Sequence, residues 1–427
     1  MFFLKKRGRS ILTVFHVDAN SAYLSWTAAD LLEKAYPVDL RTVPAVIAGS
    51  VKERHGIILA KSIPAKKLGI TTAVSLPEAL KLCPSLIVFP PDYDLYLACS
   101  NAMYDILREY SPLIQRYSVD ECFIDYRDPA IHHLNPVEAA FEIKDRIRRE
   151  LGFTVNIGIG NNKLLAKMAC EMEKPDRVHT LLTQEEIEKK LWPLDVSELF
   201  MVGRATTRKL RKININTIGD LARSDLLLMQ TLFKSHGRLI HDYANGIDRD
   251  PVVTEDTLPV KSIGNGMTIR YDLLSKNEAF SYILSLCERV GTRLRAHGCK
   301  GSMIAVSVCS NGFLYYSHQV TLPFYTDDTD TIYQYACRLF LECWTREPVR
   351  KLGVRVGSLV SGTEYQLSLY DASEIKKTES LNNVIDRIRL RFGTEAVYRG
   401  IFANSGLKPV EGGVNDGNYL MMGGYRQ

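Results

Sequence analysis

The chain has 427 residues, of which 46% are hydrophobic and 24% are charged. This ordinary composition for a soluble globular protein excludes wholesale disorder, a collagen-like repeat and a coiled coil. At roughly 150 residues per domain, the length predicts two to four domains. The net charge of +5 permits a nucleic-acid partner but does not demonstrate one.

Nine cysteines are scattered singly, with no CxxC pair and no accompanying histidine cluster. The pattern predicts core thiols in a reducing compartment and disfavours disulfides or a zinc site. Near the start, charged residues follow apolar ones, and the next apolar run contains His16 and Asp18. Neither a signal peptide nor a membrane anchor is therefore expected, and the protein is predicted to be cytoplasmic.

The first 180 residues alternate between strand and helix patterns. Strands are predicted over 11–17, 43–49, 56–60, 86–89, 122–126 and 154–159, and helices over 20–32, 76–83, 95–110 and 137–150. This alternation predicts one mixed sheet flanked by helices.

The pattern changes after residue 182. Residues 184–245 are helical and basic, and 248–259 form an irregular, charge-mixed linker. A second α+β domain is predicted after it, with strands over 302–309, 315–322 and 354–360 and helices over 279–296 and 331–344. From about residue 393 the glycine-rich sequence predicts a disordered tail.

Two acidic positions are candidates for chemistry. Asp18 ends the first apolar strand, and Asp120 and Glu121 open another. If both strands share a sheet, three carboxylates converge at its edge, where divalent cations are the usual compensation. Two Mg²⁺ ions there would suit in-line phosphoryl transfer. Taken alone, a helix cap at Asp18 and a solvated turn at 120–121 explain the same residues.

Longer motifs decide between these readings. Residues 16–23 (HVDANSAY), 117–125 (YSVDECFID) and 156–167 (NIGIGNNKLLAK) resemble the palm motifs of Y-family translesion DNA polymerases. Residues 79–84 (ALKLCP) and 173–175 (EKP) match the same family in the same order. The resemblance runs from about residue 11 to about residue 405, nearest the bacterial UmuC-like and DinB-like enzymes and closer to UmuC.

The resemblance implies an α+β multidomain right hand. Its parts are a palm (11–21 and 92–181), small fingers (22–91), a helical thumb with a helix-hairpin-helix (182–248), a linker (249–259), an α+β little finger (260–368) and a C-terminal clamp-binding peptide and tail (369–427).

The same resemblance implies roles for single residues. Asp18, Asp120 and Glu121 would be the catalytic metal ligands, joined by the backbone carbonyl of Ala19. Tyr23 would be the steric gate, whose ring leaves no room for a ribose 2′-hydroxyl.

The triphosphate site departs from the family pattern. A Tyr and an Arg three residues apart are usual in the fingers, but here Ile63 and Lys66 stand there. Lysine keeps the charge and loses the planar two-donor grip of arginine. Lys66 and Lys174 are the predicted triphosphate ligands, and Lys163 and Lys167 are interpreted as structural.

The thumb has the clearest predicted DNA contacts. Residues 199–212, followed by 218–221, resemble a helix-hairpin-helix in which a glycine turn points backbone N–H groups at a DNA phosphate. The predicted contacts are Gly203, Arg204, Arg208 and Lys209. Met201 stands at the position where the family usually has the first glycine of the hairpin, and this difference predicts a less tight turn.

The C-terminal half adds two binding predictions. Lys261 begins a segment (261–270) that resembles the DNA-gripping strand of the little finger, and Arg355 is among the basic residues near its last strand. Residues 366–370 (QLSLY) resemble the peptide that bacterial polymerases insert into the sliding clamp (beta). Its expected anchors are Gln366, Leu367, Leu369 and Tyr370.

These motifs together predict a low-fidelity DNA-directed DNA polymerase for translesion synthesis, acting as a monomer on primer-template DNA and dNTP with two Mg²⁺ ions. The alternative is a catalytically silent DNA- and clamp-binding accessory protein. The intact carboxylates argue against it, and the departures at Ile63 and Met201 lend it slight support. A need for accessory subunits and the lesions bypassed stay open.

Overall fold

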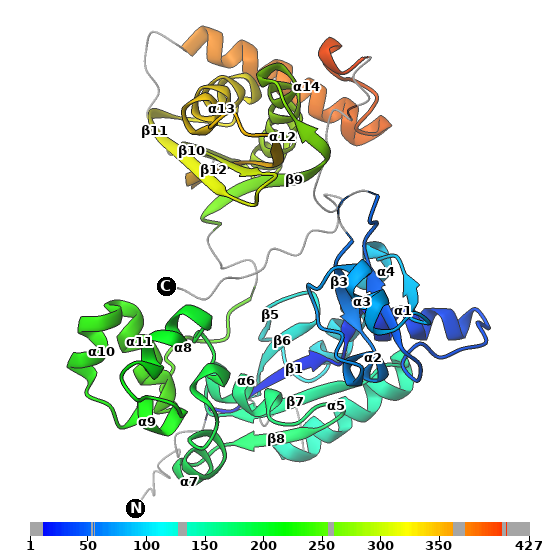
Figure 1. Ribbon diagram of the computed structural model, residues 1–427, viewed down its shortest axis with the longest axis vertical. Coiled ribbons are helices and arrows are strands. Elements are labelled where there is room, and N and C mark those ends of the chain that lie inside the picture. The colour runs from blue at the N-terminus through cyan, green and yellow to red at the C-terminus, as the bar shows by residue number, and fades with distance from the viewer. Residues whose placement is uncertain are drawn as a thin grey trace, which may run out of the picture. The chain divides into compact units, whose positions relative to one another are not determined.

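The computed structural model describes residues 12–52, 54, 56–126, 135–254, 260–361, 372–403 and 407, with side chains from residue 380 onward in the last helix. The described residues divide into an N-terminal unit, residues 12–48 with 58–254, and a C-terminal unit, residues 260–407 with the described part of 49–57 (Figure 1). None of the described helices combines the length and the apolar character that a membrane crossing requires.

A five-stranded mixed sheet lies at the centre of the N-terminal unit. Its strand order is β5 (Ile114–Arg116), β6 (Glu121–Asp125), β1 (Val14–Ala19), β7 (Val155–Gly160) and β8 (Val178–Leu181). Only β7 and β8 run parallel. The predicted mixed sheet is confirmed, while β5 and β8 were not predicted because strands this short show no clear period.

Side-chain alternation gives β1 two different faces. Phe15, Val17 and Ala19 pack into a core with α4 (Tyr93–Arg108), α5 (Pro136–Leu151) and Trp26 of α1 (Ala22–Glu33). Because successive side chains of a strand point to opposite faces, His16 and Asp18 face the other side. That side is covered by α6 (Lys163–Glu171), which packs on β7 and β1.

The backbone of helix α6 lies in direct contact with the backbone of β7. A Cβ atom added at Gly158 would lie 1.9 Å from the carbonyl oxygen of Ala166, and one added at Gly160 would lie 2.4 Å from its nitrogen. No side chain fits at either position, so both must be glycine. This contact brings Lys167 and Glu171 of α6 next to the end of β1.

A smaller three-stranded sheet follows α1 in the chain. Its order is β3 (Ile58–Lys61), β2 (Ala45–Ala48) and β4 (Ile87–Phe89), accompanied by the short helices α2 (Ile63–Lys67) and α3 (Leu76–Leu82). The Ser62 hydroxyl accepts a hydrogen bond from the Ala65 N–H and so caps α2. These strands and α3 lie where the sequence predicts them.

Residues 184–244 are helical, as predicted. They comprise α7 (Gln184–Glu186), a π-helical turn (Ile187–Leu191), a 3-10 turn (Val196–Glu198), α8 (Arg204–Arg211), α9 (Ile218–Ala222), α10 (Leu226–Phe233) and α11 (Ser235–Ala244). Leu210, Ile218, Met229 and Ile240 are fully buried in their shared core.

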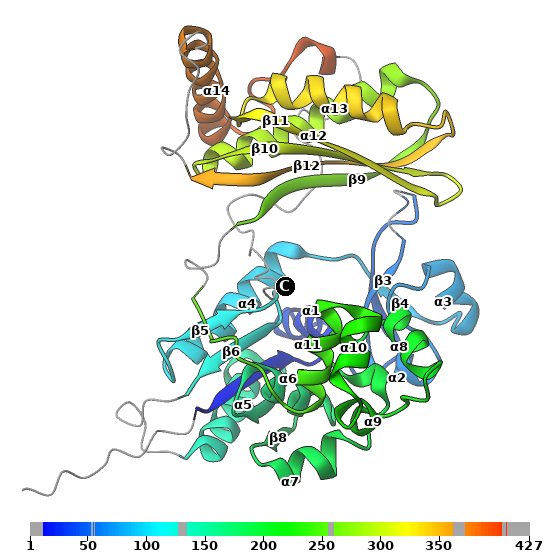
Figure 2. The ribbon, with the colours of Figure 1, turned by 90° about the vertical axis from the view of Figure 1, so that its left-hand side faces the viewer.

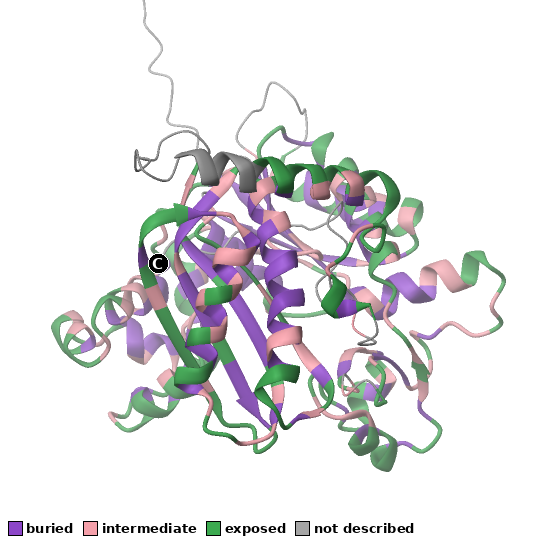
Figure 3. Cartoon of the chain, turned by 90° about the horizontal axis from the view of Figure 1, so that it is seen from above, coloured by how far each residue is buried: buried purple, intermediate pink, exposed green. Residues whose placement is uncertain are grey.

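The C-terminal unit is an antiparallel sheet with helices on one face, which confirms the predicted second α+β domain (Figures 2 and 3). Its strand order is β11 (Tyr315–Thr326), β10 (Cys299–Ser310), β12 (Val349–Ser361) and β9 (Ser262–Leu273). Helices α12 (Lys276–Ala296) and α13 (Thr329–Cys343) cover the apolar face.

Part of the predicted tail is folded onto this unit. After α14 (Ala372–Phe392), the chain continues to a 3-10 turn (Gly400–Phe402) whose Phe402 is buried. The buried carboxylate of Glu288 in α12 accepts from Arg389 Nη1 at 2.6 Å and Arg399 Nε at 2.5 Å. The prediction of disorder from residue 393 is therefore wrong for 397–402. Amino-acid composition cannot reveal that Arg399 forms an ion pair with the buried Glu288 of a distant helix.

All nine cysteines lie in described residues and are unpaired, and six of them are buried. Core thiols were predicted, and the structure agrees. Their burial raises the thiol pKa at several positions, most at Cys170 and Cys287, so these groups stay protonated near neutral pH.

Candidate active site

The predicted carboxylates lie on two neighbouring strands. In the antiparallel pairing of β1 with β6, Asp18 is directly opposite Glu121. The Ala19 N–H donates to the carbonyl oxygen of Asp120 at 3.0 Å, which ties the start of β6 to the end of β1. Ala19 itself is buried in β1. The sheet thus brings all three predicted acidic residues to one edge.

The tightest carboxylate cluster differs from the predicted set. Ligand oxygens of Asp18, Glu121 and Glu171 all lie within 4.8 Å of one another. The Asp120 carboxylate instead accepts a hydrogen bond from the Ser118 hydroxyl. Glu171, from the last turn of α6, was not predicted, because its proximity depends on the backbone contact between α6 and β7.

Two lysines partly neutralise this cluster in the structure. Lys174 pairs with Asp18 and lies 2.8 Å from Glu171 Oε1. Lys167 Nζ lies 2.9 Å from both carboxylate oxygens of Glu121. The interpretation of Lys167 as a purely structural residue is incomplete, because its ammonium contacts a predicted metal ligand. The sequence spacing could not indicate this contact across 46 residues.

Burial and charge separate the pKa values of the three predicted acids. Burial raises the pKa of Asp18 to about 7, against the opposing effect of Lys174. Burial also raises the pKa of Asp120. Burial acts in the same direction on Glu121, but His16 and the Lys167 ammonium outweigh it and hold the pKa at about 2. Strongly perturbed carboxylates in one cluster are typical of functional sites.

His16 lies under the cluster, on the same face of β1 as Asp18. It is fully buried, its Nε2 is 3.7 Å from Glu121 Oε2, and burial lowers its pKa to about 4. A neutral imidazole at this position therefore adds no positive charge near neutral pH.

The donor set suits a hard divalent cation. It offers only carboxylate oxygens, the ligands that Mg²⁺, Mn²⁺ and Ca²⁺ prefer. The raised pKa values of Asp18 and Asp120 indicate that this much buried negative charge is unfavourable without a cation. The ammonium groups of Lys167 and Lys174 supply part of the positive charge that compensates these carboxylates. A divalent cation would supply the same kind of compensation, so it fits the site electrostatically.

Tyr23 lies in the first turn of α1 within an aromatic group. Its ring stacks on Tyr96, with centroids 4.3 Å apart and an angle of 6° between the planes, and meets Tyr93 edge-on. Burial and the charge of Asp120 raise the pKa of Tyr23 to about 12. The contacts with Tyr96 and Tyr93 therefore hold the ring in place.

The two predicted triphosphate ligands line one cavity of about 290 Å³. Lys66 of α2 and Lys174 reach it together with Asp18 and Ile63. Lys61, the last residue of β3, also lines it and was not predicted as a site residue. The signal available in the sequence was a lysine five residues before Lys66, which in isolation indicates only a solvated strand end.

The predicted thumb contacts are exposed at the start and along one face of α8. Gly203 is the N-cap of α8, and Arg204, Arg208 and Lys209 all reach solvent. Met201 adopts φ +71°, the left-handed conformation that a glycine would favour. The methionine therefore accepts the glycine-like backbone, which does not support the prediction of a less tight turn.

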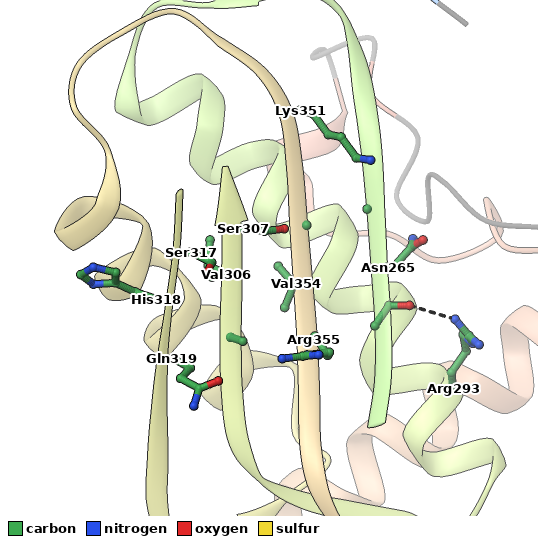
Figure 4. A pocket seen from close by; sticks show the side chains of 14 residues that line it. Asn265, Arg293, Val306, Ser307, Ser317, His318, Gln319, Lys351, Val354 and Arg355 are labelled. Atoms are coloured by element: carbon green, nitrogen blue, oxygen red, sulfur yellow. Dashed lines mark hydrogen bonds between the residues drawn. The ribbon is translucent and has the colours of Figure 1, made fainter. Parts of the chain in front are cut away.

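The face of the C-terminal sheet opposite α12 and α13 holds a pocket of about 670 Å³ (Figure 4). Strand register places small residues side by side here: Gly353 lies beside both Gly266 and Ser307, and Gly264 and Ala305 lie on either side of Arg355. Arg355 and Lys351 are exposed on this face, and Lys261 is exposed just before β9. Gln366, Leu367, Leu369 and Tyr370 of the predicted clamp peptide lie outside the described residues.

Comparisons with known proteins agree with this geometry. Residues 17–171 match the model of the impB/mucB/samB family, and residues 260–369 match that of its C-terminal domain. The chain is 44% identical to DNA polymerase IV of Clostridium acetobutylicum over 91% of this chain and 97% of that protein. It is 37% identical to DNA polymerase IV of Acetivibrio thermocellus over 91% and 96%.

A solved Y-family DNA polymerase chimera, Dbh-Dpo4(243-245)-Dbh, has the same fold, with a TM-score of 0.71, 20% identity and coverage of 82% of this chain and 99% of that one. The palm, fingers, thumb and little-finger architecture is thereby confirmed. A position nearer UmuC is not supported, because these relatives carry the name DNA polymerase IV. The chain belongs to the impB/mucB/samB family and is a Y-family DNA-directed DNA polymerase.

Proposed function

We propose that this polymerase copies past damaged template bases with low fidelity, using Asp18, Asp120 and Glu121 to hold two Mg²⁺ ions. The single observation that carries the proposal is the meeting of these acids on adjacent strands beside a lysine-lined cavity. The backbone carbonyl of Ala19 would complete one coordination shell. Bound Mg²⁺ would favour the alkoxide of the primer 3′-hydroxyl and offset charge on the phosphates.

The proposed reaction joins the primer 3′-oxygen to the α-phosphorus of a dNTP, and the bond from that phosphorus to the bridging oxygen breaks to release pyrophosphate. The hydroxyl proton leaves to solvent. Lys66 and Lys174 would bind the triphosphate, and Tyr23 would lie beneath the sugar. For Lys174 this requires release from Asp18 and Glu171, its present partners.

The proposed domain boundaries follow the resemblance. The five-stranded sheet would be the palm (11–21 and 92–181), and the small sheet with α2 and α3 would be the fingers (22–91). The helical region would be the thumb (182–248), joined by a linker (249–259) to the little finger (260–368). Residues 369–427 would hold the last residues of the clamp-binding peptide, which begins at Gln366, and the tail.

Two surfaces support binding of primer-template DNA without base specificity. One is the exposed basic face of α8 that begins at Gly203. The other is the open face of the C-terminal sheet, where Arg355 and Lys351 stand among glycines and serines (Figure 4). Small neighbours leave a smooth surface that a phosphate backbone can approach closely, and Lys261 extends its positive charge.

Replacing both Arg208 and Lys209 with alanine should weaken primer-template binding and reduce its salt dependence. Each lost phosphate contact lowers the slope of log affinity against log salt by about 0.9, so the double variant should lose about 2 in slope. Fluorescence anisotropy over a series of salt concentrations measures this. The matched control is Arg148→Ala with Arg149→Ala, which removes equal charge from α5, where the side chains are 64% and 70% exposed. An equal slope in both variants contradicts the thumb contact.

Partner contacts beyond DNA and dNTP rest on the sequence alone. Gln366 would orient a peptide whose apolar anchors, Leu367, Leu369 and Tyr370, enter a groove of the sliding clamp. A monomeric protein in the cytoplasm is proposed as the working state. The catalytically silent alternative is not favoured by relatives that are DNA polymerases.

Primer extension by the purified protein tests the proposal. Templates are undamaged in one series and carry a single abasic site in the other, with dNTPs and Mg²⁺ present or chelated. Extension on both templates, lost on chelation, is the expected result. Primer-template binding without extension, even after sliding clamp is added, would instead support the silent accessory protein.

A further inference from the structure

Lys61 is the last residue of β3, directly before the Ser62 cap of α2. It lines the cavity of about 290 Å³ together with Asp18, Lys66 and Lys174. Three lysines from separate positions in the chain therefore reach one cavity beside the acidic cluster. Like charges that converge on one cavity repel one another, and an anion bound between the ammonium groups would relieve this repulsion.

The three lysines differ in how their charge is balanced. Lys174 pairs with Asp18 and Glu171. Within the described parts of the chain, neither Lys61 nor Lys66 has a carboxylate at ion-pair distance. Among the described residues, Lys61 Nζ donates only to the neutral Thr72 hydroxyl, at 2.9 Å. Burial, and then the charge of Lys66, lowers the pKa of Lys61. The cavity thus carries uncompensated positive charge on its fingers side.

We propose that Lys61 is a further ligand of the nucleotide triphosphate and acts with Lys66 in place of one planar two-donor guanidinium. The inference rests on the proposed function and deepens it. A single ammonium binds phosphate as a point charge, so two ammonium groups on opposite sides of a phosphate recover part of the grip that Lys66 lacks alone. Lys61 Nζ now donates to the Thr72 hydroxyl, and a phosphate oxygen in the cavity could replace that hydroxyl as the acceptor.

A structural role for Lys61 would have a different signature. If Lys61 only ties β3 to the turn at Thr72, then Lys61→Ala and Thr72→Val should lower thermal stability by similar amounts and leave nucleotide affinity unchanged. If Lys61 binds phosphate, Lys61→Ala should weaken nucleotide binding, whereas Thr72→Val retains the ammonium and should change it little.

The experiment measures single-nucleotide insertion and inhibition by inorganic tripolyphosphate in wild type, Lys61→Ala, Lys61→Arg, Thr72→Val and Lys67→Ala. Lys67 is the matched control, an exposed lysine of α2 that does not line the cavity. For Lys61→Ala, KM for dNTP and Ki for tripolyphosphate should both rise about tenfold, the effect of one charge-assisted hydrogen bond. Lys61→Arg should restore most of this, and primer-template affinity should stay unchanged.

Equal KM and Ki values for Lys61→Ala and Lys67→Ala, with an active wild type, would overturn the assignment of Lys61 and leave the polymerase proposal intact. If wild type extends no primer, the proposed function fails first. Calorimetric titration of tripolyphosphate into wild type and Lys61→Ala then still decides, because equal affinity overturns the role of Lys61 and a tenfold loss supports it.

Discussion

Asp120→Asn is expected to lower kcat for nucleotide insertion about a thousandfold, because a neutral amide cannot replace an anionic metal ligand. A thousandfold loss corresponds to about 4 kcal/mol of lost transition-state stabilisation. Glu171→Gln should lower it less than about fivefold. The Glu171 side chain is 43% exposed and already paired with Lys174, and ion pairs of this kind contribute about 1 kcal/mol or less. Single-turnover insertion at saturating dNTP measures both effects.

The two variants distinguish between two possible sets of metal ligands, the predicted set with Asp120 and the set of closely spaced carboxylates with Glu171. Asp18, Glu121 and Glu171 have the closest oxygens, whereas Asp120 bonds to Ser118. Asp120 stays the expected ligand because its backbone is hydrogen-bonded to Ala19, the residue after Asp18 in β1. If Glu171→Gln abolishes insertion and Asp120→Asn does not, the metal site contains Glu171 instead.

Stability provides an internal control for Asp120→Asn. Burial penalises the Asp120 carboxylate and raises its pKa, so neutralising it should not lower the thermal midpoint in the absence of metal. Loss of activity with an unchanged or higher midpoint is the behaviour of a functional group kept at a cost in stability. A lower midpoint would attribute the lost activity to damaged packing.

Tyr23→Ala is the second large expected effect. If the ring of Tyr23 lies beneath the sugar, removing it should lower discrimination against ribonucleotides about 10- to 100-fold, since forcing extra atoms into a packed site costs about 1–3 kcal/mol. The stack on Tyr96 and the edge contact with Tyr93 keep the ring from moving aside. The measurement is the ratio of kcat/KM for dCTP and CTP opposite a template guanine.

Tyr23→Phe is the matched control, because it retains the ring and the stack on Tyr96 while removing the hydroxyl. It should keep the wild-type discrimination. Equal ratios for Tyr23→Ala and wild type would contradict a steric gate at this position. A loss in both variants would assign discrimination to the hydroxyl group and not to the ring.

Much of this protein is determined by local sequence. The apolar, β-branched run before Asp18 specifies β1, and its period of two residues dictates that His16 and Asp18 face away from Phe15 and Val17. The helical period and the basic face of α8 are equally local. The family was identified from the order and spacing of the motifs around Asp18, Asp120 and Glu121, which are also local features of the sequence.

Tertiary structure alone decided the partners of the carboxylates. Glu171, Lys167 and Lys174 reach the acidic edge because two glycines in β7 admit the backbone of α6, a contact between chain segments that propensity does not register. The same holds for Lys61. Its proposed role depends on the cavity that it lines together with Lys66 and Lys174, which the sequence does not show. Electrostatic energy depends on distance in space, so sequence specified which charges exist and the fold specified which of them interact.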